Sequence, residues 1–177
     1  MAFVMMRHPV DRLISLYYYL KKATWEPTYS EEWASMTLME YIQSDHVESN
    51  WMVRFLVGKP EGLVDEHDLE EAKRILLDKF WIGLQPRFAE SVQRFGFLFD
   101  WKANPNWNAC YADVEAGKNR ANSNSAKEHV DIESTEWAML REVNELDLKL
   151  YVYANELYQQ QGATYFPQLE HQATTQL

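Results

Sequence analysis

The sequence predicts an α/β protein that is mostly helical and contains about two short parallel strands. Two continuous apolar runs, AFVMM at 2–6 and FWIGL at 80–84, indicate buried strands because neither alternates with polar residues. Most of the remaining chain carries apolar residues at helical spacing. A two-stranded sheet is marginal alone, so we interpret the chain as the second half of an α/β domain and expect the preceding part to lie outside it.

The composition is that of one folded domain, which we place at 1–160 with a polar tail at 161–177. Hydrophobic residues make up 46% of the 177 residues and aromatic residues 14%. The single cysteine, Cys110, excludes an internal disulfide and suits a reducing compartment. No apolar run approaches the roughly 20 residues that span a bilayer, and no signal-peptide pattern is visible. We therefore expect a cytoplasmic protein.

The net charge of −10 is unevenly distributed. Residues 1–22 carry four basic residues and one acidic residue, a local charge of +3. Residues 23–72 carry two basic and twelve acidic residues, a local charge of −10. A nucleic-acid binder needs a broad basic face, and this distribution argues against one. The positive charge near the N-terminus suits one small anion.

The first half of the chain predicts three helices after the first strand. One covers 9–22, because Pro9 suits a first helical residue. Thr37 and Glu40 form a capping box that opens a second helix through about Ser44. The third covers 49–57 and is ended by Gly58 and Pro60.

The second half alternates helices with one strand and one loop. Asp68 is expected to cap a helix through about Lys79, which leads into the strand at 80–84. Pro86 is expected to start a helix through about Phe95. Residues 101–130 are rich in Asn, Gly and Pro and predict loops. A long helical region at about 134–160, bent near Asn144, completes the domain.

The connection between the first strand and the first helix is a candidate anion site. Ligands of open α/β sheets bind at the carboxyl ends of strands, and a helix start offers free N–H donors. Arg7 would add a planar guanidinium that suits phosphate oxygens, and Ser15 could donate its hydroxyl to the same anion. The alternative is an arginine paired at the surface and a serine facing solvent. Spacing alone does not decide between the two interpretations.

The motif around this connection resembles the 3′-phosphate-binding segment of sulfotransferases. The resemblance is to the group that includes the Golgi carbohydrate and heparan-sulfate 2-O-sulfotransferases and their bacterial relatives. It extends over roughly residues 2–160, and three later segments agree in order: 50–58 with an N-x-x-x-R-x-L-x-G helix, 72–88 with a helix–strand segment, and 144–158 with an N-x-x-D-x-x-L-Y-x-x-A helix. The motif itself, R-x-P-x-x-R-x-x-S-x-Y, consists of Arg7, Pro9, Arg12, Ser15 and Tyr17.

The resemblance implies a P-loop-NTPase-like sulfotransferase fold, of which this chain would be the C-terminal part. It also implies transfer of a sulfuryl group from 3′-phosphoadenosine-5′-phosphosulfate (PAPS) to a hydroxyl or amine, without a metal. Arg7 and Ser15 match the residues that hold the donor's 3′-phosphate, and Arg12 belongs to the same motif. A later loop with Lys118, Asn119 and Arg120 falls where relatives fold over the nucleotide; an exposed polar loop is the alternative.

Two parts of a complete sulfotransferase are not recognisable in the sequence. The family's donor loop, a Lys followed by Ser or Thr in a Gly-containing turn, is absent, and so is a recognisable general base. We expect both upstream, so this chain alone is expected to be inactive. His8 is a more plausible phosphate ligand than base, and His46 and His67 are expected to be solvated surface residues. No metal-ligand spacing is present.

Three functional hypotheses therefore remain. The first is the sulfotransferase, whose acceptor would be a small or neutral carbohydrate because the acidic stretch at 23–72 disfavours a polyanion. Tyr17, Tyr18, Tyr19 and Trp25 could line its acceptor cleft or could simply pack. The second hypothesis is a non-catalytic nucleotide- or partner-binding remnant of that fold. The third is a helical interaction protein.

Overall fold

The computed structural model describes residues 1–27, 29–117, 130–167 and 169. It divides into two compact units. The sheet unit comprises the described parts of Met1–Arg7, Glu70–Ser123 and Tyr151–Leu177. The helical unit comprises the described parts of His8–Leu69 and Asn124–Leu150. Within the described residues, the boundaries fall between Arg7 and His8 and inside two helices, α5 (Glu66–Lys79) and α9 (Glu145–Tyr165).

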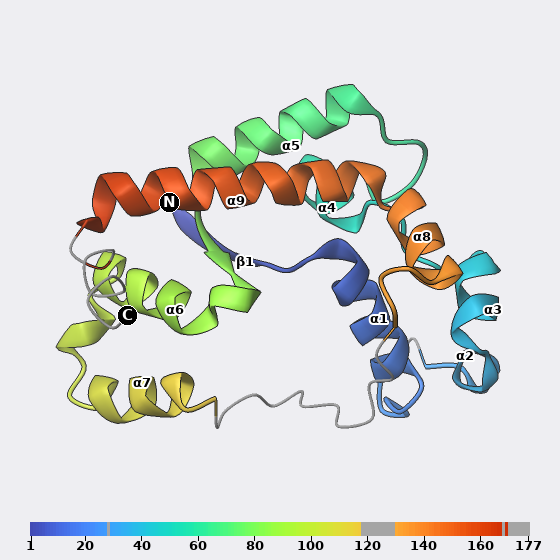
Figure 1. Ribbon diagram of the computed structural model, residues 1–177, viewed down its shortest axis with the longest axis horizontal. Coiled ribbons are helices and arrows are strands. Elements are labelled where there is room, and N and C mark those ends of the chain that lie inside the picture. The colour runs from blue at the N-terminus through green and yellow to red at the C-terminus, as the bar shows by residue number, and fades with distance from the viewer. Residues whose placement is uncertain (28, 118–129, 168, 170–177) are drawn as a thin grey trace. The chain divides into compact units, whose positions relative to one another are not determined.

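The two predicted strands are present and pair in parallel (Figure 1). β1 (Ala2–Met6) pairs with β2 (Phe80–Leu84) so that Val4 lies opposite Ile82. The α/β class and the mostly helical content are thus confirmed. The expectation that β1 is fully buried is wrong. Only Met6 is buried, and Phe3 is 46% exposed, because the described residues place a neighbouring strand on one edge of β1 and not on the other.

The edge of β2 that faces away from β1 is occupied by side chains. Gln161 of α9 accepts a hydrogen bond from the Ile82 N–H at 2.9 Å and donates one to the Phe80 carbonyl at 3.1 Å. The hydroxyl of Ser91 accepts a hydrogen bond from the Leu84 N–H at 2.9 Å. These side chains satisfy buried backbone groups that another strand would otherwise pair.

Helix α6 (Phe88–Leu98) packs on the sheet through Phe95. It follows a single 3₁₀ turn, Gln85–Arg87, in which Pro86 is the second residue, and the α-helix begins two residues later than predicted. A Cβ built on Gly83 would lie 2.7 Å from the Phe95 ring. The absence of a side chain at Gly83 therefore allows the ring to approach the strand.

The prediction of loops over 101–130 is wrong for its first part. A 3₁₀ turn, Trp101–Ala103, and helix α7 (Trp107–Glu115) lie there. Of the residues that suggested loops, Asn104, Pro105 and Asn106 precede α7 and Asn108 lies in its first turn, whereas Asn119, Asn122 and Asn124 lie outside the described residues. At the other end of the chain, α9 continues to Tyr165 and Phe166 is buried, so packed structure extends beyond residue 160.

The helical unit is built on α1 (Pro9–Leu20), which packs against α8 (Thr135–Glu142). Helix α3 (Leu38–Gln43) packs against α8 as well, and the predicted capping box of Thr37 and Glu40 is confirmed. A short helix, α2 (Glu31–Ser35), was not predicted. The buried core between α1, α3 and α8 consists of Val10, Leu13, Ile14, Ile42 and Leu140.

The remaining helices confirm most predicted boundaries. Helix α4 (Trp51–Val57) ends at Gly58 as expected, and the break between α8 and α9 falls at Val143–Asn144. The cap of α5 was assigned to the wrong residue. Asp65, rather than Asp68, accepts hydrogen bonds from the first turn, through the His67 N–H at 2.9 Å and the Asp68 N–H at 3.1 Å.

Candidate functional site

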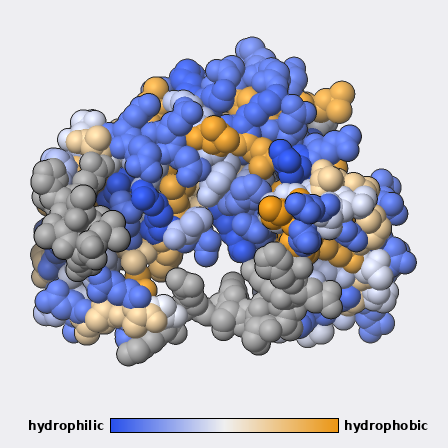
Figure 2. Space-filling model, in the orientation of Figure 1, coloured by the Kyte–Doolittle hydropathy of each residue, from blue (hydrophilic) through white to orange (hydrophobic). Residues whose placement is uncertain are grey.

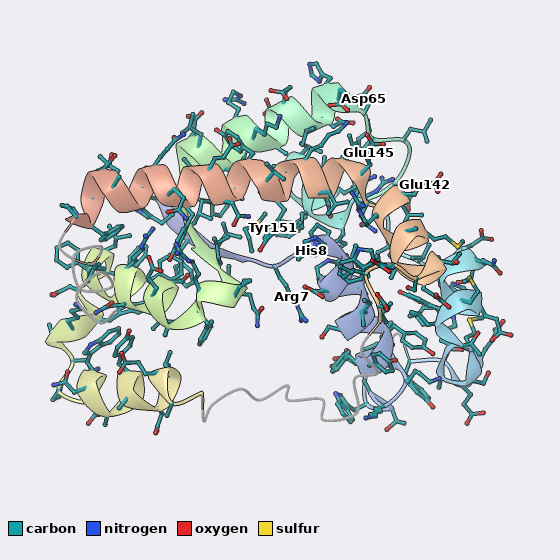
Figure 3. The ribbon with its side chains drawn as sticks, viewed as in Figure 1. Arg7, His8, Asp65, Glu142, Glu145 and Tyr151 are labelled. Atoms are coloured by element: carbon teal, nitrogen blue, oxygen red, sulfur yellow. The ribbon has the colours of Figure 1, made fainter. Side chains whose placement is uncertain are left out.

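The candidate anion-binding segment begins where β1 ends. Arg7 and His8 connect β1 to α1, and Pro9 occupies the first turn of α1 as predicted (Figure 3). The residue at the N-cap position, His8, makes no side-chain hydrogen bond to the helix start. A helix start without a side-chain cap retains N–H donors for a ligand. Asp11, in the first turn, partly offsets the favourable field there.

Arg7 is half-buried, and its Nε is shielded from solvent without a hydrogen-bond partner among the described residues. A shielded guanidinium N–H is costly to leave unpaired, so this side chain suits an acceptor supplied from outside. Arg7 belongs to the sheet unit and Ser15 to the helical unit, so each is placed within its own unit.

His8 lies against α8 through its ring, which stacks on Trp137 with a centroid separation of 5.6 Å. Burial lowers the pKa of His8 below 6.5; Asp11 raises the pKa and Arg141 lowers it further. The neutral imidazole is therefore favoured near neutral pH. A neutral ring can donate one hydrogen bond to an anion but adds no positive charge.

Arg12, the second arginine of the motif, has internal partners. Its Nη1 donates to the Glu48 carboxylate at 2.8 Å, and its guanidinium lies over the Trp51 ring at 5.0 Å from the centroid. The Glu48 carboxylate already uses one end of the guanidinium fork. Arg12 therefore connects α1 with the segment that precedes α4, in addition to any contact with a ligand.

The last two residues of the motif differ in their environment. Ser15 is half-buried on α1, and its hydroxyl has no hydrogen bond within the part of the chain that the structure describes. Tyr17 is buried and its hydroxyl donates to the Met36 carbonyl at 2.8 Å. Tyr17 is thus a packing residue, whereas Ser15 keeps a hydroxyl available for a ligand.

The remaining candidate residues lie partly inside and partly outside the described part of the chain. Trp25 is 72% exposed and packs on Tyr19, whose hydroxyl donates to Glu26. His46 packs on Trp33, and His67 is exposed in the first turn of α5. Lys118, Asn119 and Arg120 lie outside the described residues.

Two of the predicted motif segments, 50–58 and 144–158, bond to each other. Asn50 Oδ1 accepts hydrogen bonds from the N–H groups at the start of α9, at 2.9 Å from Leu146 and 3.1 Å from Asp147. The Asp147 carboxylate in turn accepts from the start of α4, at 2.9 Å from the Met52 N–H and 2.8 Å from the Val53 N–H. Each segment therefore caps the helix of the other.

Asn144 extends this junction. Its Oδ1 accepts a hydrogen bond from the Asn50 N–H at 3.1 Å, and its Nδ2 donates to the Leu140 carbonyl at 2.9 Å. Asn144 and Asp147 are both fully buried. The Asn and Asp of the N-x-x-D pattern thus have a structural role, which sequence spacing alone did not reveal because their partners Asn50, Met52 and Val53 lie over 90 residues away.

Arg54, the arginine of the N-x-x-x-R-x-L-x-G segment, also has a structural role. Its Nε donates to the Ser49 carbonyl and its Nη1 to the Gly62 carbonyl, each at 2.8 Å. Gly58 ends α4 with φ of 67°, a left-handed conformation that favours glycine. This segment therefore fixes the turn after α4.

Comparisons with known proteins do not identify a family. No protein-family model, no curated protein and no solved structure matches the chain. Within the described residues, no group of His, Cys, Asp and Glu side chains is arranged to hold a metal ion. The described helices include none with the length and apolarity that crossing a membrane requires.

Proposed function

We propose that the chain binds the 3′-phosphate of PAPS through Arg7 and Ser15, as part of a sulfotransferase. The observation that carries the proposal is the state of the motif residues. Within the described part of the chain, Arg7 Nε is shielded and unpaired and the Ser15 hydroxyl has no hydrogen bond. Two other residues of the motif have structural roles: Pro9 lies at the start of α1, and Tyr17 is buried in the core.

The reaction would move a sulfuryl group from the 5′-phosphate oxygen of PAPS to an acceptor oxygen or nitrogen. A base would take the acceptor's proton, and 3′,5′-adenosine bisphosphate would leave. In this chain, Arg7 would supply a fixed positive charge and the uncapped start of α1 would supply N–H donors. Both would bind and orient the nucleotide by its 3′-phosphate.

Arg12 is a second candidate under this proposal, because its Nε and Nη2 are shielded from solvent without a hydrogen-bond partner among the described residues. Its Nη1 is already bonded to Glu48 and its guanidinium is stacked on Trp51. Under the proposal, Arg12 would hold α1 in place through Nη1, and its Nε and Nη2 would remain as donors for the nucleotide.

A second candidate function is a nucleotide-binding protein without transfer activity. It is favoured by one feature of the sequence: none of the lysines is followed by Ser or Thr, so the usual donor loop is not recognisable. The two candidates differ in turnover with PAPS, and both require the 3′-phosphate contact.

Titration with 3′,5′-adenosine bisphosphate tests the proposed contact. At a ligand concentration of 100 times Kd, the free energy of unfolding should rise by about 2.7 kcal/mol. The Arg7→Ala variant should lose most of this gain, whereas Arg74→Ala, which removes an exposed arginine paired with Glu71, should keep it. Adenosine 5′-monophosphate, which lacks the 3′-phosphate, should bind more weakly. An equal gain in Arg7→Ala would contradict the proposal.

A further inference from the structure

A pocket of about 290 Å³ lies beside α4 in the helical unit. Four of its five lining residues, Trp51, Arg54, Phe55 and Gly58, follow the i, i+3, i+4, i+7 spacing and so share one side of the helix and its end. Pro60 completes the lining. This volume is at the lower end of the range for small-molecule sites, which are usually lined by aromatic groups and a few polar ones.

The side of α4 that lines the pocket is not the side that packs into the protein. Met52 and Val53 are buried. Trp51, in contrast, is 40% exposed and Phe55 67% exposed, and their rings stack with centroids 5.1 Å apart and an interplanar angle of 14°. On the surface in Figure 2, hydrophobic residues form separate patches among mainly hydrophilic ones. Two exposed, stacked rings at one pocket therefore offer a contact surface for a flat apolar group.

Arg54 is the charged residue of the pocket lining. Its Nε donates to the Ser49 carbonyl and its Nη1 to the Gly62 carbonyl, each at 2.8 Å, so the guanidinium is fixed in place. Its Nη2 makes only a long contact of 3.5 Å with Ser49 Oγ and can donate to an acceptor in the pocket. The charge of Arg54 acts on Asp147, but that carboxylate is buried, accepts two backbone hydrogen bonds and does not line the pocket.

Two other cations near the pocket are already paired with carboxylates. Arg12, whose guanidinium lies over the Trp51 ring, is bonded to Glu48 at 2.8 Å. Lys59, which follows Gly58, is bonded to Asp68 at 2.9 Å. The hydrogen-bond acceptors of the pocket arginine among the described residues are all neutral carbonyl or hydroxyl groups. A ligand in the pocket therefore meets a positive charge that has no carboxylate bonded to it.

The pocket thus combines two exposed aromatic rings with one cationic donor. An inorganic anion would bond to the donor but would leave the rings exposed. A neutral aromatic ring would cover the rings but would make only a weaker, uncharged hydrogen bond to Arg54. A cationic ligand would be repelled. An aromatic ring that carries a carboxylate satisfies both parts of the lining, because the ring can stack and the carboxylate can accept from the guanidinium.

We propose that this pocket binds an aromatic carboxylate. The ring of the ligand would stack on Phe55, the more exposed of the two aromatic residues, and its carboxylate would accept a hydrogen bond from Arg54 Nη2. All five lining residues lie in the helical unit, and the inference does not depend on the proposed function.

Saturation-transfer NMR on the full chain tests the charge requirement, with phenylacetate as the probe. We expect transfer to the ring protons of phenylacetate. Phenylacetamide has nearly the same shape without the charge and should bind about tenfold more weakly. Phenethylamine, which carries a positive charge, should bind more weakly still. Cyclohexylacetate keeps the carboxylate without the aromatic ring and should also bind more weakly than phenylacetate.

Point variants test the location. Phe55→Ala should raise the Kd of phenylacetate about threefold or more. Phe97→Ala removes another exposed phenylalanine, which does not line the pocket, and should leave this Kd unchanged. Arg54→Gln removes the charge, and its effect on folding is checked by thermal unfolding. If Arg54→Gln folds, phenylacetate and phenylacetamide should bind to it about equally.

Three results would each overturn the proposal: no transfer to phenylacetate, an equal Kd for phenylacetate and phenylacetamide, or an unchanged Kd in Phe55→Ala. Displacement of phenylacetate by 3′,5′-adenosine bisphosphate would also overturn it, because the nucleotide would then occupy this pocket. Arg7→Ala should leave phenylacetate binding unchanged. Loss of nucleotide binding in wild type with retained phenylacetate binding would contradict the proposed function alone.

Discussion

Asn50 and Asp147 cap each other's helices: the Asn50 side chain accepts from the first N–H groups of α9, and the Asp147 carboxylate accepts from those of α4. The pair joins residues that are far apart in the sequence. Loss of the Asn50 side chain should therefore weaken the start of α9, and loss of the Asp147 side chain the start of α4.

Asp147→Ala should destabilise the chain by about 2–4 kcal/mol. The substitution removes a helix cap and leaves the buried Met52 and Val53 N–H groups without an acceptor. Asp147→Asn keeps one acceptor oxygen and should cost less. Urea unfolding gives both values, with Asp78→Ala as the control because this aspartate is exposed on α5. Equal stability of wild type and Asp147→Ala would contradict the capping role.

The stability of the chain should depend on pH through Asp147. Burial raises the pKa of this carboxyl above 3.8, although its hydrogen bonds from Met52 and Val53 and the charges of Arg12 and Arg54 act in the opposite direction. A raised pKa means that the folded state binds the proton more tightly than the unfolded state. The corresponding stability is fully present below pH 3.8 and is lost as pH rises through the folded-state pKa.

The comparison with Asp147→Asn isolates this effect. Other carboxyls with a lowered pKa, those of Glu40, Asp68 and Glu145, contribute stability that increases as pH rises, but they are common to both proteins. The free energy of unfolding of wild type minus that of Asp147→Asn should therefore fall with rising pH. If this difference instead rises with pH, the hydrogen bonds to the Asp147 carboxylate have a larger effect on its pKa than burial has.

Gly83→Ala should destabilise the chain by about 1–3 kcal/mol, because the new Cβ would overlap the Phe95 ring. The double variant Gly83→Ala with Phe95→Leu removes the overlapping ring and should cost less than the sum of the two single changes. Thermal unfolding of the four proteins measures the difference. Additive losses would contradict direct contact between the two residues.

Local signals in the sequence predicted local structure. Both strands, the capping box at Thr37 and the end of α4 at Gly58 depend on neighbouring residues, and the structure confirms them. The cap of α5 was misassigned because Asp65 and Asp68 both suit a helix start. Helix α7 was missed because its few apolar residues do not outweigh the nearby Asn and Pro.

Long-range relationships could not be predicted. Nothing near Arg12 in the sequence indicates Glu48 as its partner, and nothing near Asn50 indicates Asp147, since such pairs depend on how the helices pack. The pocket lined by Trp51, Arg54, Phe55, Gly58 and Pro60 was missed for a different reason. Trp51 and Phe55 have the spacing of a buried helix face, and only their exposure distinguishes them.

The side-chain bonds along β2 determine how the sheet could grow. The outward backbone groups of Phe80, Ile82 and Leu84 are already hydrogen-bonded to Gln161 and Ser91. No further strand can therefore pair with that edge of β2. In the parallel register, the backbone groups of Phe3 and Met5 point to the opposite border, where the described residues offer no partner. Any additional polypeptide strand would therefore have to join from the β1 side.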